Sequence, residues 1–153
     1  MAEIKIGSAA PDFSLEGDDG KRHSLKDFRG KKIVLYFYPK DDTSGCTKES
    51  CSFRDNLSSI KRKGAVVIGI SADGVESHKK FISKYDLNFP LLSDESKSVL
   101  EEYGVWQLKS FMGRKYMGIV RTTFIIDEKG KVSHIFPKVK VEGHTEEVLN
   151  ALS

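Results

Sequence analysis

The sequence has few cysteines, no long apolar run and little excess of charge of one sign. Its 153 residues include two cysteines, Cys46 and Cys51, whereas a small protein built on disulfides carries many more. No uncharged stretch approaches the roughly 20 residues of a membrane span. The N-terminus, MAEIKIGSAAPDF, lacks the apolar core of about 7–15 residues that signal peptides have. We therefore expect a cytoplasmic protein that does not bind membranes.

The charges are nearly balanced. Lys and Arg number 25 and Asp and Glu 22, which gives a net charge of +3. Basic runs are short, and the longest, Lys61-Arg62-Lys63, stands where a helix is expected to end. This balance gives no indication of nucleic-acid binding. Hydrophobic residues make up 39% of the chain, which suits one core and predicts a single domain over residues 1–153.

Several segments predict strands. Two continuous apolar runs, IVLYFY at 33–38 and AVVIGISA at 65–72, are typical of strands that are covered on both faces. Residues 13–28 contain the turn signal GDDG and predict a hairpin. A second hairpin is expected from the strands at 122–126 and 131–136, which flank DEKG.

Helical patterns fill the intervals between the strands. An apolar stripe of Phe53, Leu57 and Ile60 predicts a helix over residues 46–62. The other helices are expected at 75–85, at 95–103 and from Thr145 to near the C-terminus. Strands that alternate with helices in this order predict an α/β fold, a thioredoxin-like three-layer sandwich with a central mixed β-sheet, flanking helices and an N-terminal β-hairpin.

The stretch with the clearest chemistry runs from the first buried strand through Pro39 and a short loop into a helix. Cys46 is expected in the first helical turn, where unpaired N–H groups and the helix dipole favour a thiolate over a thiol. The thiolate is the reactive form of cysteine. Thr43, three residues earlier, can offer a hydroxyl to the sulfur or to a bound oxygen. The alternative for Cys46 is a small buried apolar side chain, because it lies on the same stripe as Phe53.

Cys51 lies off that stripe. Five residues at about 100° each place it roughly 140° around the helix from Cys46, whereas a core cysteine would face the stripe. In an intact helix the two Cα atoms are roughly 8.6 Å apart, and a disulfide needs them closer than about 7 Å. We therefore predict two thiols while the helix is intact, and a disulfide only when its first turns unwind.

Other chemistries for the cysteine pair have less support. Structural zinc takes four ligands, usually Cys or His, and the four histidines are scattered: His23, His78, His134 and His144. We therefore expect these histidines to lie on the surface or to be hydrogen-bonded, and we expect no metal and no cofactor. Four residues separate the cysteines, so the C-x-x-C motif of dithiol reductases is absent.

Two further features stay open at this point. Arg121 immediately precedes the TTFII strand, from which its side chain either reaches the end of a neighbouring strand or lies on the surface. Trp106, Phe111, Tyr116 and Met117 belong to a glycine-punctuated segment, VWQLKSFMGRKYMGIV. This segment either lines a pocket or covers the sheet.

The motif Pro39-x-x-x-Thr43-x-x-Cys46, with Cys51 five residues later and Arg121 before Thr-Thr-Phe-Ile-Ile-Asp, resembles the peroxiredoxins. More closely, the chain resembles their PrxQ branch, also called bacterioferritin comigratory protein. The resemblance extends over nearly the whole chain, through the stretches APDF at 10–13, YFYP at 36–39, YGVW at 103–106, SFMG at 110–113 and GI at 118–119.

One position departs from the usual pattern of that branch. Its members commonly read Thr-Pro-Gly-Cys, where this chain has Thr43-Ser44-Gly45-Cys46. Proline fixes φ and lowers the entropy of the unfolded chain. We expect Ser44 to cap the helix instead, the rigidity of the loop to differ and the chemistry to survive.

The resemblance implies a cofactor-free thiol peroxidase that reduces hydrogen peroxide and organic hydroperoxides. The residue matching Cys46 is the peroxidatic cysteine, which becomes a sulfenic acid. The residue matching Cys51 resolves it as an intramolecular disulfide, and thioredoxin or a similar dithiol donor reduces that disulfide. Arg121 would favour the thiolate and bind the peroxide oxygen.

The resemblance also implies roles for the residues around the sulfur. Thr43 would orient the peroxide, Pro39 would shield the sulfur from water, and N–H groups near Gly45 and Cys46 would stabilise the leaving oxygen. The branch suggests a monomer or weak homodimer. Two other functions stay open: a disulfide reductase or isomerase on the same fold, and a redox-sensing or chaperone-like module that consumes peroxide once.

Overall fold

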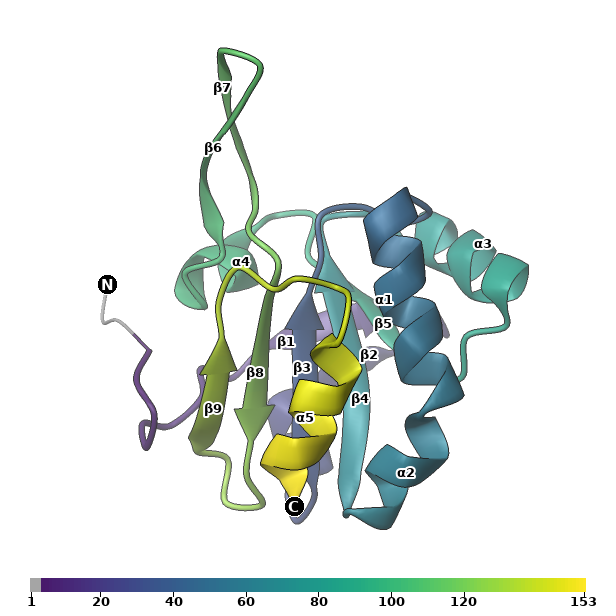
Figure 1. The fold of residues 1–153 in the computed structure, drawn as a ribbon, viewed down its shortest axis with the longest axis vertical. Helices are drawn as coiled ribbons and strands as arrows, with labels where there is room; N and C mark the ends of the chain where they lie inside the picture. The colour runs from purple at the N-terminus through teal and green to yellow at the C-terminus, as the bar shows by residue number, and fades with distance from the viewer. Residues whose placement is uncertain (1–3) are drawn as a thin grey trace.

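The central feature of the fold is one mixed β-sheet. The computed structural model describes residues 4–153, and within them seven strands form the sheet in the order β2-β1-β5-β4-β3-β8-β9 (Figure 1). Strand β3 is parallel to β4 and antiparallel to β8. The strands are β1 (Ser14–Gly17), β2 (Arg22–Ser24), β3 (Lys32–Phe37), β4 (Ala65–Ser71), β5 (Leu91–Ser93), β8 (Thr122–Ile126) and β9 (Val132–Phe136).

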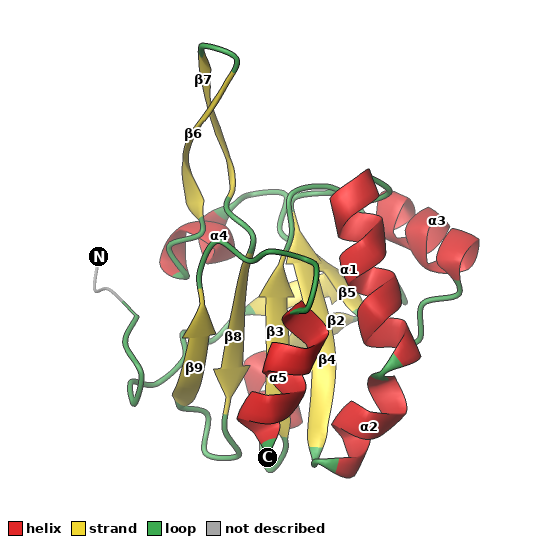
Figure 2. Ribbon diagram, viewed as in Figure 1, coloured by secondary structure: helices red, strands yellow, loops and turns green. Residues whose placement is uncertain are grey.

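Helices cover both faces of this sheet. They are η1 (Leu25–Phe28), α1 (Ser44–Asp55), α2 (Leu57–Arg62), α3 (Val75–Tyr85), α4 (Ser98–Glu102) and α5 (His144–Leu152). Successive residues of a strand face opposite sides, so Val34 and Tyr36 pack in one core with α1, α2, α3 and α5. Ile33 and Leu35 pack in the other core with η1 and α4. Figure 2 shows α1 and α5 on the near side of the sheet.

The thioredoxin-like sandwich predicted from the sequence is confirmed. The two apolar runs form β3 and β4, which are buried almost throughout because each face of the sheet has its own core. Helix α3 has the bounds that its pattern predicted. Within residues 4–153, the structure has no helix that is both long and apolar enough to cross a bilayer.

Several predicted boundaries were wrong. The helix expected over 46–62 is divided at Asn56, whose φ of −109° and ψ of 9° leave the helical range and whose side chain donates to the Ser52 carbonyl. The last helix starts at His144, after Gly143 in a left-handed conformation, rather than at Thr145. The helix expected at 95–103 spans Ser98–Glu102, and strand β5 was not predicted because three residues show no periodicity.

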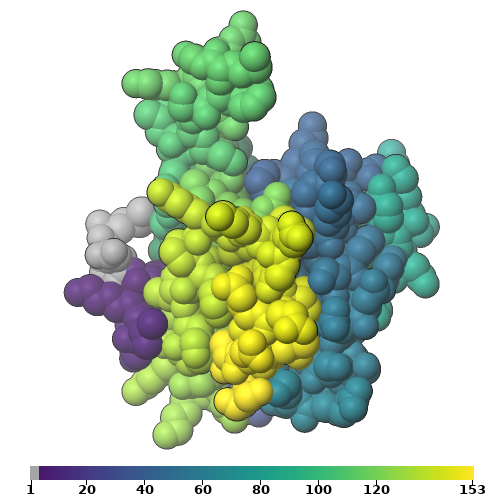
Figure 3. Space-filling model, viewed as in Figure 1, coloured from purple at the N-terminus to yellow at the C-terminus, as the bar shows by residue number. Residues whose placement is uncertain are grey.

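The segment around Phe111 forms a second, two-stranded sheet. Strands β6 (Trp106–Phe111) and β7 (Arg114–Ile119) pair as an antiparallel hairpin, which stands away from the rest of the molecule (Figures 1 and 3). Trp106 packs against a core at the base of the hairpin. The remaining aromatic and Met side chains are exposed, so they neither line a pocket nor cover the main sheet.

Candidate active site

Cys46 lies where the sequence placed it, in the first turn of a helix. The chain leaves β3 at Phe37 and enters α1 at Ser44, so Cys46 is the third helical residue. Its side chain is 1% exposed and belongs to the same core cluster as Phe53. The first N–H groups of the helix have no acceptor within it and are directed toward this end. Both interpretations of Cys46 therefore hold, since it is buried and also lies in the field of a helix N-terminus.

Arg121 reaches the sulfur across 75 residues of sequence. Its Nη2 donates to Cys46 Sγ at 3.3 Å, and its Nη1 donates to Glu49 Oε1 at 2.7 Å. Strand β8 pairs with β3 so that Thr122 is opposite Phe37. This register places Arg121, the residue before β8, beside the C-terminal end of β3, from which the chain leads through a loop into α1. The sequence had left open that Arg121 lies on the surface, and this alternative is therefore wrong.

Glu49 completes this group, and sequence reasoning missed it. Its side chain is 2% exposed, and burial raises its pKa to about 7 despite the opposing effect of Arg121. Within residues 4–153, its Oε2 has no hydrogen-bond partner. A carboxylate three residues after Cys46 lies on the same side of the helix, and this spacing was the available signal. Cys46 and Glu49 therefore share one guanidinium.

The loop residues before Cys46 differ in part from expectation. Thr43 is the N-cap of α1, but its hydroxyl donates to the Lys40 carbonyl at 2.9 Å and makes no capping hydrogen bond to the helix. Ser44 is the first helical residue and makes no capping bond, so the cap expected of it is absent. Gly45 packs closely, since a Cβ there would lie 3.2 Å from Arg121 Nη2.

Cys51 is a half-buried free thiol on the same helix. Helix α1 continues without a break from Ser44 to Asp55, and both cysteines are unpaired. This is the dithiol form predicted for an intact helix. The partial exposure of Cys51 also agrees with its predicted position off the apolar stripe. Pro39 is half-buried in the loop that precedes α1, and its shielding of the sulfur stays a prediction.

A buried polar network fixes the loop between β3 and α1. Tyr38 Oη donates to Asp41 Oδ1 at 2.6 Å, and His78 Nδ1 lies 2.7 Å from Asp41 Oδ2. The other His78 nitrogen, Nε2, lies 2.9 Å from the Leu92 carbonyl. His78 is therefore hydrogen-bonded rather than free, as is the buried His144, whose pKa is lowered chiefly by desolvation.

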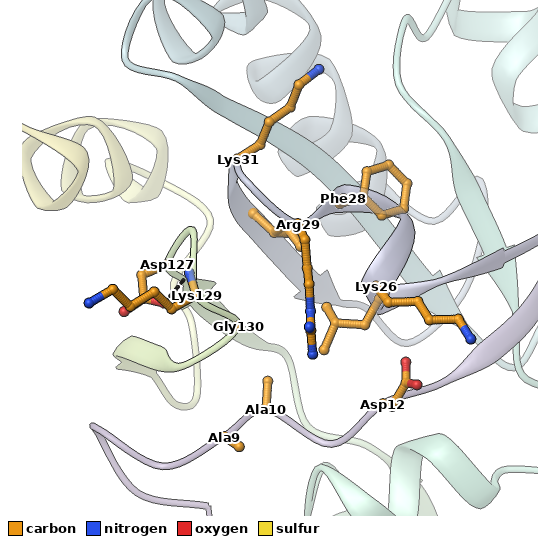
Figure 4. A pocket seen from close by; sticks show the side chains of 12 residues that line it. Ala9, Ala10, Asp12, Lys26, Phe28, Arg29, Lys31, Asp127, Lys129 and Gly130 are labelled. Carbon is orange, nitrogen blue, oxygen red and sulfur yellow. Dashed lines mark hydrogen bonds between the residues drawn. The ribbon is translucent and has the colours of Figure 1, made fainter.

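One cavity lies far from Cys46, and another lies beside the start of α1. The first, of about 220 Å³, lies beside the first residues of β3, where the Arg29 side chain extends toward Ala10 (Figure 4). It is separated from Cys46 by roughly the 20 Å length of β3. A second cavity, of about 480 Å³, borders Ser44 and Gly45 at the start of α1. Its lining includes neither Cys46 nor Arg121, so this cavity adjoins the first turn of the helix without reaching the sulfur.

Comparisons with known proteins indicate the family of this chain. The family model for the AhpC/TSA family matches residues 6–135. The putative peroxiredoxin bcp of Coxiella burnetii is 54% identical over 149 residues, which cover 97% of this chain and 99% of that protein. A solved PrxQ mutant of Xylella fastidiosa has a TM-score of 0.93 and 33% identity, with 99% of this chain and 97% of that one covered.

A structure of Xanthomonas campestris bacterioferritin comigratory protein, from work on trapped intermediates, is also similar to this chain. It has a TM-score of 0.90 and 36% identity, and the match covers 99% of this chain and 97% of that one. The family match, the relatives and the shared fold lead to one assignment. This chain belongs to the AhpC/TSA family and, within it, to the PrxQ branch of the peroxiredoxins, which are thiol peroxidases.

Proposed function

We propose that Cys46 carries out the peroxidase reaction on hydrogen peroxide and organic hydroperoxides. Its thiolate attacks the terminal peroxide oxygen, so that an S–O bond forms while the O–O bond breaks. The sulfur is oxidised to a sulfenic acid, and the leaving oxygen takes a proton and departs as water or an alcohol. Organic hydroperoxides are included because the similar Xanthomonas protein is described as having alkyl peroxide reduction activity.

The observation that carries this proposal is the 3.3 Å contact between Arg121 Nη2 and Cys46 Sγ. A guanidinium at that distance favours the thiolate and strengthens hydrogen bonds to the peroxide oxygens. The N–H groups of the first turn of α1 add partial positive charge at the same place. The thiolate, the substrate and the leaving oxygen are thus stabilised by one preorganised set of donors.

The second step forms the disulfide. The Cys51 thiolate attacks the sulfenic sulfur, so that an S–S bond forms while the S–O bond breaks, and the leaving hydroxide takes a proton and departs as water. The roughly 8.6 Å between their Cα atoms in an intact helix requires α1 to unwind first. The bond between Ser52 Oγ and Thr145 Oγ1, 2.6 Å long, ties α1 to α5 and has to open if unwinding reaches Ser52. The break at Asn56 separates this motion from α2.

A coupled assay tests both steps. Peroxide consumption is measured with thioredoxin, thioredoxin reductase and NADPH for the wild type, Cys46→Ser and Cys51→Ser. We expect no turnover in Cys46→Ser, and in Cys51→Ser one equivalent of peroxide consumed with little recycling through thioredoxin. Full activity of Cys46→Ser would end the assignment. Insulin reduction without peroxide turnover would favour a disulfide reductase, and a single turnover in the wild type would favour a redox sensor.

Peptide mapping tests the disulfide directly. After one equivalent of peroxide and alkylation, the wild type should give a peptide in which Cys46 is linked to Cys51. Two alkylated thiols after complete peroxide consumption would contradict the resolving role of Cys51. The matched control is Cys51→Ser, which should instead yield a sulfenic acid that dimedone traps.

We also propose that the protein acts in the cytoplasm as a monomer or weak homodimer. In residues 4–153, both cysteines lie on α1, so the proposed disulfide forms within one chain and needs no partner subunit. Sedimentation velocity at micromolar concentration should give a species of about the 17.1 kDa chain mass. A stable dimer at low concentration would contradict the proposed monomer or weak homodimer.

A further inference from the structure

The β6–β7 hairpin presents an apolar tip to solvent. The large apolar side chains that are exposed within residues 4–153 all lie on it, apart from Ile6. They are Leu108, Phe111, Met112, Tyr116 and Met117, with exposed fractions between 46% and 87%. The space-filling view shows this segment standing clear of the body of the molecule (Figure 3). Such a concentration of exposed apolar surface on one element marks an interaction site.

The apolar side chains occupy both faces of the hairpin. Leu108 is opposite Met117 in the register, and these two point to one face. Tyr116 and Phe111 point to the other face, and Met112 is in the turn. A flat protein surface that docks on a two-stranded sheet covers one face and leaves the other in water. Both faces lose their contact with water together when the tip is immersed in an apolar medium.

The charges on the hairpin have one sign. Residues 106–119 include Lys109, Arg114 and Lys115 and no acidic residue. Arg114 and Lys115 are exposed beside the turn, whereas the Lys109 ammonium donates to the Ile119 carbonyl. This arrangement is complementary to an anionic surface. It disfavours a second copy of the chain, because two such hairpins would repel each other.

The foot of the hairpin carries charges of both signs. The loop between β9 and α5 has the exposed residues Lys138, Lys140 and Glu142, and it passes beside the hairpin base in Figure 1. Glu101 and Glu102 of α4 are also exposed and line a cavity together with Gln107 of the hairpin. The charge of one sign is therefore confined to the hairpin itself.

The hairpin is joined directly to the active site. The Val120 N–H donates to the Val105 carbonyl at 2.8 Å and closes the base of the hairpin, and Arg121 is the next residue. A surface that holds the tip therefore lies roughly 20 Å, the length of a six-residue strand, from the hairpin base and the residues that surround the sulfur.

From these observations we infer that the hairpin anchors the protein to an anionic lipid bilayer. The apolar tip enters the boundary between headgroups and acyl chains, while Arg114 and Lys115 bind lipid phosphates. The unpaired edges of the two strands keep the insertion shallow, because backbone groups without partners are unfavourable in hydrocarbon. This inference revises the expectation of no membrane contact.

The anchor is independent of the proposed peroxidase function, because lipid affinity can be measured on Cys46→Ser.

Vesicle co-sedimentation tests the anchor. The reduced protein is mixed with vesicles of phosphatidylcholine, with and without phosphatidylglycerol. We expect binding to the anionic vesicles that weakens with salt. The double variant F111S/M112S should bind at least about tenfold less, as should R114Q/K115Q. The matched control Ile6→Ser, which removes an equally exposed apolar side chain elsewhere, should bind like the wild type.

Several outcomes would overturn the anchor. They are the absence of wild-type binding to anionic vesicles, equal binding by F111S/M112S, and equal binding to vesicles without phosphatidylglycerol. If F111S/M112S instead raises the KM for thioredoxin and the wild type ignores vesicles, the hairpin is a docking site for the reductant protein.

A peroxidase assay separates the anchor from the chemistry. F111S/M112S should turn over hydrogen peroxide at the wild-type rate, because the tip lies roughly 20 Å from the hairpin base beside Arg121. A slower rate would mean that the substitutions disturb the active site and would overturn the hairpin as a separate binding element. Failure of wild-type turnover with hydrogen peroxide would refute the peroxidase function and leave the vesicle result standing.

Discussion

Replacing Glu49 with Gln should stabilise the protein at alkaline pH and have little effect at acid pH. The pKa of the buried Glu49 carboxyl is raised from 4.5 to about 7, chiefly by desolvation. Between these values the folded protein keeps a proton that the unfolded chain has released, so stability falls as pH rises through this window. The full change corresponds to about 3 kcal/mol. Glutamine has no charge to desolvate and still accepts the Arg121 bond.

Urea unfolding provides the measurement. Unfolding of the reduced wild type and Glu49→Gln is followed by the fluorescence of Trp106, the single tryptophan, between pH 4.5 and pH 8. The free-energy difference between the two proteins should change by about 3 kcal/mol over this range in favour of the variant. The titration of His144 is common to both proteins and cancels. The exposed Glu101→Gln is the control and should show no such change.

Two results would refute this reasoning. One is a difference between Glu49→Gln and the wild type that stays constant with pH. The other is a variant that is less stable than the wild type at pH 8, which would mean that the ion pair with Arg121 outweighs the desolvation of the carboxylate.

Three further substitutions test the loop and the first turn. Ser44→Pro should raise the free energy of unfolding by about 0.4–1 kcal/mol in urea titrations, because position 44 is the first helical residue and Thr43 is already extended. A loss of stability would show that the backbone at position 44 is incompatible with proline. Gly45→Ala should slow the peroxide reaction roughly tenfold in stopped-flow measurements, because the added Cβ displaces the Arg121 guanidinium. The free energy of unfolding should stay equal or rise, because alanine has the higher helix propensity. An unchanged rate would contradict the close contact between Gly45 and Arg121. His78→Leu should cost about 2 kcal/mol in thermal or urea unfolding, because it removes one hydrogen bond to the buried Asp41 carboxylate, which keeps those from Tyr38 and Ser77; a loss below about 0.5 kcal/mol would show that water replaces the imidazole.

Features set by neighbouring residues were predictable from the sequence. The apolar runs of β3 and β4 indicated strands with two covered faces, and the start of α1 placed Cys46 in a first helical turn. The five-residue spacing to Cys51 determined that an intact helix holds two separate thiols. Each of these follows from periodicity or local geometry, which a short segment expresses by itself.

The tertiary structure decided everything that depends on contacts between distant segments. Only the pairing of β8 with β3 brings Arg121 to the sulfur, and only the burial of Glu49 beside both raises its pKa. The direction of the β6–β7 hairpin away from the sheet likewise had no local signal, since its alternating residues suit a covered strand equally well. Burial and long-range proximity are properties of the packed chain, and the sequence pattern of one segment does not contain them.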